Sequence, residues 1–215
     1  MGEHLSVKAI EAGGQVQCFG FLNEELKMQP RELIDFLGVI GQLKRNTRHV
    51  WGESGRQESV AEHSWRLAVM ALLVGDEFDG LDVEKVVKMC LIHDFGEAIT
   101  GDIPSFYKTK QDREKEDAAV TGLLQGLPSG LADEFAKLFE EMAELKTEEA
   151  KLFKALDRIE AIISHNESPL ETWLPLEYTE NITYGDENVT HSEYLKKLKK
   201  EIKNDTIRKI EKGVK

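Results

Sequence analysis

Apolar residues recur every three to four positions along most of the chain, which is the period of an amphipathic α-helix. Pro30 is a typical helix-start residue, and the segment that follows it has apolar side chains at this spacing: Leu33, Ile34, Phe36, Leu37, Ile40 and Leu43. The pattern predicts helices over residues 31–44, 60–75, 81–99, 114–127, 130–145, 148–166 and 192–215. No alternating strand pattern extends beyond a few residues. We therefore expect an all-α fold, a bundle of roughly seven or eight helices.

Polar residues at the ends of these segments predict where helices begin. Ser59 is followed three residues later by Glu62, which is the capping-box pattern at the start of a helix. Asp82 is the expected N-cap of the helix over residues 81–99. Thr100 and Gly101 then form a stop signal for that helix.

The segments between the helices predict a single domain. Residues 46–59 are polar, contain two glycines and are expected to form a loop, and residues 167–191 are rich in turn formers and aromatics and are expected to be irregular. No internal linker or repeat is present. We expect one domain over residues 1–215, with a core at 31–165 and a C-terminal extension at 166–215.

Composition excludes several classes of protein. Hydrophobic residues make up 40% of the 215-residue chain, and no run of about 18 apolar residues is present, so we expect no membrane span. A net charge of −12 argues against binding nucleic acid, which needs a basic face. The two cysteines, Cys18 and Cys90, suggest no disulfide framework, and the first residues are unlike a secretory signal, so a cytoplasmic location is expected.

Four side chains with metal-ligand chemistry lie in apolar helical surroundings: His63, His93, Asp94 and Asp157. Burying charged groups is costly unless they are paired or bind a metal. Neighbouring residues on a helix diverge by about 100°, so His93 and Asp94 reach one point only if it lies between them, which favours an ion. Two imidazoles and two carboxylates would leave coordination positions for water or phosphate. Taken alone, Asp157 could instead pair with Arg158 or a lysine.

The order His63, His93-Asp94, Asp157 resembles the H…HD…D signature of the HD-domain metal-dependent phosphohydrolases. Three stretches resemble the 5′-deoxynucleotidase branch of that family: "ESVAEHSWRLAVMA", "LIHDFGEAITGDIP" and "KALDRIEA". The similarity extends from about Leu43 to Ile163. It implies that the four side chains bind one divalent ion, which could be Mn, Co, Mg, Zn or Fe.

The same resemblance implies roles for residues near the ligands. Glu97 matches the acid that orients or deprotonates the attacking water, and Asp102 matches a second acid near the sugar and the scissile phosphate. Arg48 matches the arginine that binds the phosphate. Trp51 matches a tryptophan that restricts the 2′ side of the sugar, although in some relatives this tryptophan directly follows the arginine.

The resemblance implies a phosphohydrolase that removes phosphate from nucleoside 5′-monophosphates, with a preference for deoxy forms. Two alternatives stay open: hydrolysis of another phosphoester, such as a nucleoside triphosphate, an alarmone or a phosphonate-like metabolite, and a nucleotide-sensing module without turnover. Relatives are often dimers, so we expect a homodimer with the apolar N-terminal helix at its interface. Trp65 and Cys90 are expected in the core.

Overall fold

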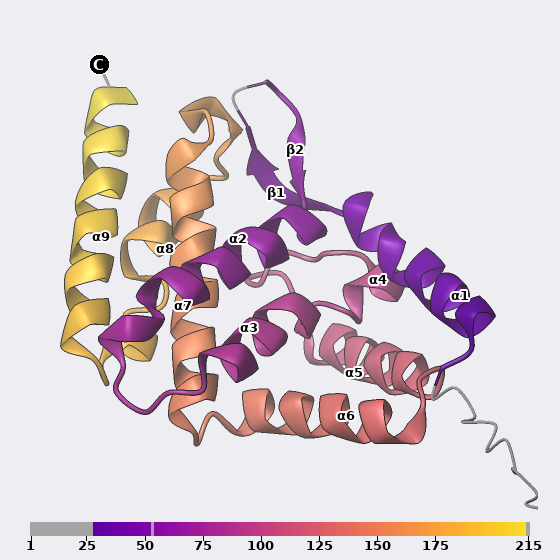
Figure 1. Cartoon of the computed structure of the whole chain (residues 1–215). Helices are drawn as coiled ribbons and strands as arrows, with labels where there is room; N and C mark the ends of the chain where they lie inside the picture. Colours follow the sequence, from indigo (N-terminus) through magenta and orange to yellow (C-terminus); the bar gives the residue numbers. More distant parts are fainter. Residues whose placement is uncertain (1–27, 53, 214–215) are drawn as a thin grey trace, which may run out of the picture.

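The computed structural model describes residues 28–52 and 54–213, and it confirms the predicted all-α class. Cys18 lies outside the described residues. The helices are arranged as in Figure 1. Their bounds are α1 Pro30–Ile40, α2 Val60–Val74, α3 Val83–Ile92, α4 Glu97–Thr100, α5 Lys110–Leu124, α6 Ser129–Glu144, α7 Glu148–Glu167, α8 Glu177–Thr183 and α9 Glu193–Gly213. In the part of the chain that the structure describes, no helix is long and apolar enough to cross a membrane.

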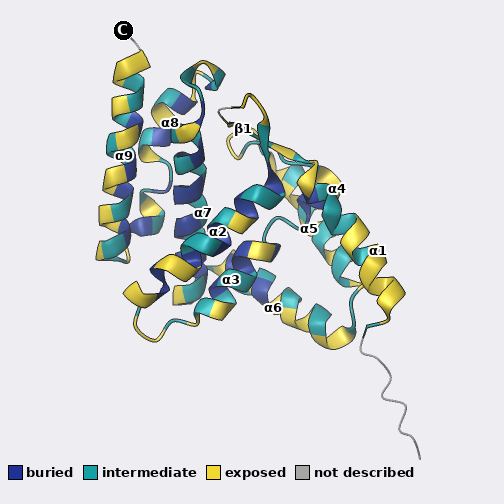
Figure 2. Ribbon diagram, turned by 45° about the horizontal axis from the view of Figure 1, so that its top comes forward, coloured by how far each residue is buried: buried dark blue, intermediate teal, exposed yellow. Residues whose placement is uncertain are grey.

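Helix α7 lies at the centre of the fold. It contacts α2, α3, α6 and α9, and its buried apolar side chains include Leu152, Leu156 and Ile159. Dark blue along α7 in Figure 2 marks this buried surface. The predicted burial of Cys90 is confirmed. The prediction for Trp65 was wrong, because its side chain lies on the outer side of α2 and is 64% exposed.

Residues 46–59 form a β-hairpin, so the prediction of a loop was wrong. Strand β1 (Thr47–Trp51) pairs antiparallel with β2 (Gln57–Ser59). The sequence "TRHVW" contains the β-branched and aromatic residues that strands prefer, and Gly55, with φ +76°, allows the tight turn. The hairpin places β1 against α7.

The helix predicted over residues 81–99 is broken where His93 and Asp94 lie. Helix α3 ends at Ile92, and α4 begins only at Glu97. The intervening turn packs closely on α5: a Cβ atom at Gly96 would lie 2.7 Å from Glu116 Cγ and 2.9 Å from its carbonyl oxygen. His93 is thus the C-cap residue of α3, and Asp94 follows it in the turn.

The predicted helix starts are confirmed at two positions. Ser59 Oγ accepts a hydrogen bond from the backbone N–H of Glu62, and the Glu62 carboxylate accepts one from the Ser59 N–H at 2.8 Å. Asp82 accepts a hydrogen bond from the N–H of Lys85 at 3.0 Å. The Ser59 cap fixes the start of α2 one turn before His63.

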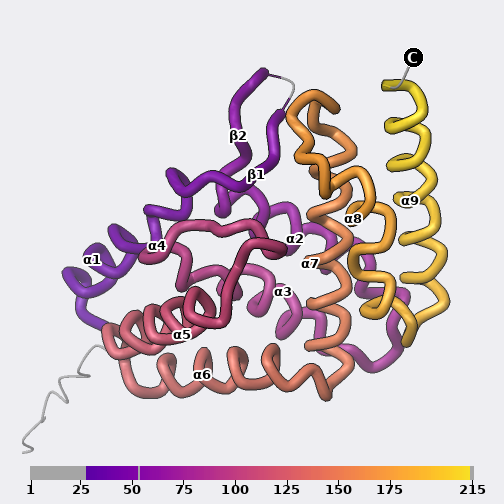
Figure 3. The backbone as a smooth tube through the Cα atoms, turned by 180° about the vertical axis from the view of Figure 1, so that it is seen from behind, coloured from indigo at the N-terminus to yellow at the C-terminus, as the bar shows by residue number. Residues whose placement is uncertain are grey.

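The C-terminal segment contains more regular structure than its sequence suggested. Residues 167–191, predicted to be irregular, include α8 and two short 3-10 helices at Leu170–Thr172 and Glu187–Val189. Helix α8 lies between α7 and α9 in both Figure 1 and Figure 3. Because α8 lies beside α7, it can contribute to a site built on α7.

Candidate metal centre

The structure brings together the four side chains predicted as metal ligands. His63 comes from α2, His93 and Asp94 from the turn after α3, and Asp157 from α7. Asp157 Oδ1 lies 3.4 Å from His63 Nε2 and 3.9 Å from His93 Nε2, and Asp94 Oδ2 lies 3.1 Å from His93 Nε2. One donor atom from each of His63, His93 and Asp94 lies within 4.8 Å of the other two.

Both imidazoles are oriented with Nε2 toward this cluster. His63 Nδ1 hydrogen-bonds to the Glu160 carboxylate, and His93 Nδ1 lies 2.9 Å from the carbonyl oxygen of Cys90, to which it must donate. In the neutral imidazole, this arrangement leaves the lone pair of His93 Nε2 available to bind a cation. That atom is buried and has no hydrogen-bond partner among the described residues. The donor set therefore fits a divalent metal ion.

Electrostatics favours a proton on His63 and a negative charge on Asp94 and Asp157. Burial and Arg48 lower the pKa of His63, but the hydrogen bonds that His63 donates to the carboxylates of Asp157 and Glu160 outweigh them and raise it to about 9. Burial would raise the pKa of Asp157, yet Lys154 and the two histidines hold it well below its usual range. Asp157 pairs with Lys154 Nζ at 2.9 Å, whereas Arg158 stacks on the Tyr184 ring. A cation would replace the proton on His63 as the partner of these carboxylates.

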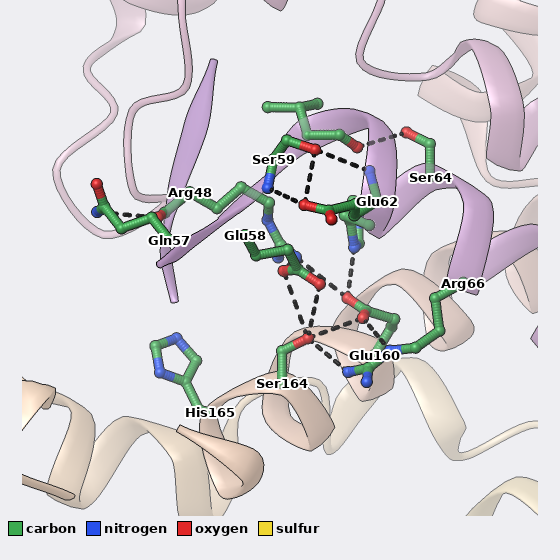
Figure 4. Close-up of polar contacts among 12 residues, drawn as sticks. Arg48, Gln57, Glu58, Ser59, Glu62, Ser64, Arg66, Glu160, Ser164 and His165 are labelled. Carbon is green, nitrogen blue, oxygen red and sulfur yellow. Dashed lines mark hydrogen bonds and ion pairs between the residues drawn. The ribbon is translucent and has the colours of Figure 1, made fainter. Parts of the chain in front are cut away.

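Glu160 is a functional candidate that the sequence did not single out. Its side chain is fully buried and accepts hydrogen bonds from Arg66 Nε at 2.7 Å and Ser164 Oγ at 2.8 Å, besides its contact with His63 (Figure 4). Burial would raise the pKa of Glu160, but His63 and the two arginines near it keep it below the usual value. The sequence feature that could have identified Glu160 is its position one helical turn after Asp157 in an apolar segment. Glu160 fixes the orientation of His63.

The two predicted catalytic acids lie on the same side of the cluster. Glu97 is 3% exposed; its Oε1 accepts a hydrogen bond from Lys108 Nζ at 3.3 Å, and its Oε2 has no partner among the described residues. A carboxylate oxygen of Glu97 lies within 4.8 Å of one of Asp94. Burial, Asp94 and Asp102 raise the pKa of Glu97 to about 9. Burial also raises the pKa of Asp102, against the effect of Arg48.

Arg48 reaches the cluster from β1. Its Nη1 lies 2.7 Å from Glu58 Oε2 and 3.2 Å from Glu160 Oε2, as Figure 4 shows. Burial would lower the pKa of Arg48, but Glu160 and Glu58 raise it, so the guanidinium stays charged. These carboxylates hold the guanidinium in place at the cavity wall.

Trp51 is separated from the cavity by one side chain. The lining residues include His49 but not Trp51. The rings of His49 and Trp51 pack edge to face with their centroids 4.7 Å apart, and the backbone N–H of Trp51 donates a hydrogen bond to Ser168 Oγ at 3.2 Å. Trp51 thus supports a side chain that faces the cavity.

A cavity of about 470 Å³ connects these residues. Its size is within the range of small-molecule sites in proteins. The predicted metal ligands, Glu97, Asp102 and Arg48 line one part of it. Another part is lined by Glu177 and Asn181 of α8 and by Tyr184, which directly follows this helix. The Tyr184 hydroxyl bonds to Ser105 Oγ at 2.9 Å and links α8 to the loop after α4. No sequence motif had assigned α8 to the site.

Residues 40–199 match the family model described as the HD domain. The chain is 38% identical over 141 residues to the human protein named 5′-deoxynucleotidase HDDC2, covering 64% of this chain and 68% of that one. The Xenopus laevis protein of that name is 39% identical over 137 residues, covering 62% and 67%.

Solved structures agree with this match. A predicted metal-dependent phosphohydrolase from Magnetospirillum magnetotacticum superposes with a TM-score of 0.72 and is 28% identical, covering 83% of this chain and 93% of that one. A conserved hypothetical protein from Pyrococcus furiosus superposes with a TM-score of 0.65 at 33% identity, covering 80% and 99%.

Proposed function

Because this chain belongs to the HD-domain family, we propose that it is a metal-dependent 5′-nucleotidase that hydrolyses deoxynucleoside 5′-monophosphates to nucleoside and phosphate. The observation that carries the proposal is the convergence of His63, His93, Asp94 and Asp157 beside Glu97 at one wall of the cavity. The names of the most similar curated proteins support the substrate class.

A divalent ion held by these four side chains supplies Lewis acidity, which offsets the phosphate charge and lowers the pKa of water toward neutrality. Glu160 and the Cys90 carbonyl keep both Nε2 atoms directed at the ion site. The mixed nitrogen and oxygen donors suit Mn, Co, Fe or Zn, and Mg if water completes the shell. The identity of the ion stays part of the proposal.

Three further residues have separate roles in the reaction: Arg48, Glu97 and Asp102. Arg48 offers a planar, permanently charged donor to phosphate oxygens. Glu97 has a carboxyl oxygen without a partner among the described residues, with which to orient the attacking water. Burial, Asp94 and Asp102 raise its pKa, and a bound cation would lower that pKa again and let the carboxylate accept the proton of the water. As the bond between phosphorus and the 5′ oxygen breaks, Asp102, whose pKa is raised by burial, gives a proton to the leaving oxygen. Trp51 restricts the space around the sugar indirectly, because it packs on His49, which lines the cavity.

A phosphate-release screen tests this proposal. Purified protein loaded with Mn, Co, Mg or Zn is incubated with ribo- and deoxymononucleotides, and we expect orthophosphate, with faster release from the deoxy forms. Asp157→Asn should abolish release, whereas Asp205→Asn, on the exposed side of α9, should not. Metal-loaded protein that releases no orthophosphate contradicts the proposal. Release of pyrophosphate or triphosphate would indicate that the substrate is another phosphoester. Nucleotide binding without turnover would indicate a sensor.

We also propose a single domain that forms a homodimer through α1. This helix has no buried residue, and Leu33, Ile34 and Leu37 are 45%, 56% and 55% exposed. Contiguous exposed apolar side chains are typical of interaction surfaces. The buried free thiol of Cys90 supports our proposal of a reducing, cytoplasmic location.

A further inference from the structure

A second group of buried polar side chains lines the cavity apart from the predicted metal ligands. It consists of His49 on β1, His165 on α7, and Glu177 and Asn181 on α8. Glu177 Oε1 lies 3.6 Å from His49 Nε2 and 3.6 Å from His165 Nε2. Both distances are too long for a hydrogen bond. We call these four residues the α8 cluster.

Three polar atoms of the α8 cluster have no hydrogen-bond partner among the described residues. They are Glu177 Oε1, His49 Nε2 and Asn181 Nδ2, and all three are buried. Glu177 and Asn181 are only 1% and 6% exposed. Buried polar groups in native proteins are nearly always hydrogen-bonded, so several orphaned atoms on one cavity wall indicate that a ligand completes the bonding.

Both imidazoles of the α8 cluster are neutral near pH 7 and Glu177 is partly protonated there, which distinguishes the cluster from the metal side of the cavity. Burial lowers the pKa of His49, and burial together with Arg48 lowers that of His165 to about 4. Burial raises the pKa of Glu177 to about 7. A wall of neutral imidazoles and an amide suits an uncharged ligand group better than a phosphate.

The α8 cluster lies at a suitable distance from the metal ligands. Asp157, Ala161 and His165 line the cavity from one face of α7. A rise of 1.5 Å per residue separates the Cα atoms of Asp157 and His165 by about 12 Å. That separation is comparable with the length of a nucleoside monophosphate, and the small side chain of Ala161 leaves the space between the two ends open.

Tryptophan rings that do not line the cavity pack against the two imidazoles of the cluster. Trp51 packs edge to face on His49, and Trp173 packs on His165 with ring centroids 6.0 Å apart. Trp173 also donates its indole N–H to the carbonyl oxygen of His165 at 3.0 Å. A pre-formed wall of this kind is typical of a ligand subsite.

We propose that the α8 cluster is the subsite for the nucleoside half of the substrate. Glu177 Oε1 accepts a hydrogen bond from the polar edge of the nucleoside, Asn181 donates one to it, and the two histidines flank it. This inference rests on the proposed function and deepens it, because it makes a segment without a recognised motif the determinant of nucleoside binding.

Two shape-conserving substitutions test the inference. Glu177 Oε2 accepts a hydrogen bond from the Leu174 N–H at 2.7 Å, so in Glu177→Gln the amide oxygen keeps that bond and the amide nitrogen faces the cavity. Asn181→Asp likewise replaces a donor with an acceptor. Each change should raise KM for a deoxynucleoside monophosphate at least 10-fold, with a smaller effect on kcat. Glu171→Gln, an exposed site in the same segment, is the matched control.

Product inhibition supplies a second readout. In both variants we expect the inhibition constant of the free deoxynucleoside to rise by a factor similar to KM, while that of inorganic phosphate stays at the wild-type value. Thermal unfolding identifies a variant that is misfolded. If one variant is misfolded, the kinetics of the other variant test the inference.

If folded variants keep wild-type KM and nucleoside inhibition, the inference is overturned although nucleotide hydrolysis stands. If the wild-type protein releases no phosphate from any nucleotide, the proposed function itself fails.

Discussion

At the scale of single residues, the candidate centre depends on how Glu160 holds His63. A carboxylate on Nδ1 fixes the imidazole tautomer and makes Nε2 a better ligand. Glu160 is itself restrained by Arg48, Arg66 and Ser164, so its position is determined by β1 and α2 as well as by α7. The geometry of the candidate ligands is thus set by residues that would not themselves contact the ion.

Glu160→Gln should weaken metal binding by about 10- to 100-fold, because a neutral amide stabilises the required tautomer less well. Titration with Mn against a competing chelator measures the effect. Glu167→Gln is the control, since Glu167 also pairs with Arg66, at 2.5 Å, but is exposed and lies at the end of α7, two helical turns beyond Glu160. Equal affinities in wild type and Glu160→Gln would show that Glu160 has only a structural role.

Glu177 should make stability depend on pH. Burial raises its pKa from 4.5 to about 7, so between these values the folded protein holds a proton that the unfolded chain releases. Stability contributed by this group is therefore full below pH 4.5 and declines as pH rises to about 7.

Glu177→Gln removes this dependence. Relative to wild type, the variant should gain about 3 kcal/mol in unfolding free energy between pH 4.5 and pH 8. Urea denaturation of both proteins at the two pH values gives the difference, with Glu171→Gln as the control. A difference that is the same at both pH values would contradict the expected titration.

At the scale of elements, the sequence predicted what depends on local signals. The capping box at Ser59 and the cap at Asp82 are set by residues three positions apart, and both were correct. The break after Ile92 was missed because the apolar period continues through it, whereas the break accompanies close packing of Gly96 on α5. The convergence of the four candidate ligands came from family resemblance, since spacing alone cannot bring α2, α3 and α7 together.

Other parts of the site had weaker signals. Glu160 was missed because an acid on a helix usually faces solvent, and only the fold shows that this one is buried between α7 and α2. The hairpin at β1 and β2 was missed because its strands are short and its turn residues are also common in loops. Helix α8 is seven residues long and depends on packing against α9.

The close contact between the turn at Gly96 and α5 should not tolerate a side chain. Gly96→Ala would place Cβ 2.9 Å from the Glu116 carbonyl oxygen, which belongs to the α5 backbone and cannot move easily. We expect a loss of about 1–3 kcal/mol in unfolding free energy, measured by denaturant titration. Gly122→Ala, on the same helix with nothing within 4 Å, should instead stabilise by up to about 1 kcal/mol. If Gly96→Ala and Gly122→Ala changed the unfolding free energy equally, the turn at Gly96 would have to adjust without cost to an added side chain.

At the scale of the whole molecule, an acidic chain encloses a cavity that mixes cations with acids. The net charge of the chain is −12, and the cavity is lined by five cations, Arg48, Lys108, Arg113, Lys154 and Arg158, and by eight acids, which include Asp94, Glu97 and Asp157. Several of these cations pair with acids, for example Lys108 with Glu116 at 2.5 Å. A local set of cations can therefore attract a phosphate against the overall field, and the acidic exterior disfavours polyanions.

The proposed homodimer places its interface on α1, far from α9 in Figures 1 and 3. Leu33, Ile34 and Leu37 lie on one face of this helix, and Phe36 on another face anchors it to Phe95 with ring centroids 6.2 Å apart. Leu37→Glu would introduce a charge into an apolar contact without disturbing that anchor, so we expect it to convert a dimer to a monomer. Size-exclusion chromatography with light scattering measures the mass. Leu73→Glu, at a 78% exposed position on α2, should leave the dimer intact. A wild-type protein that is monomeric at micromolar concentrations, or a Leu37→Glu variant that stays dimeric, would exclude α1 as the interface.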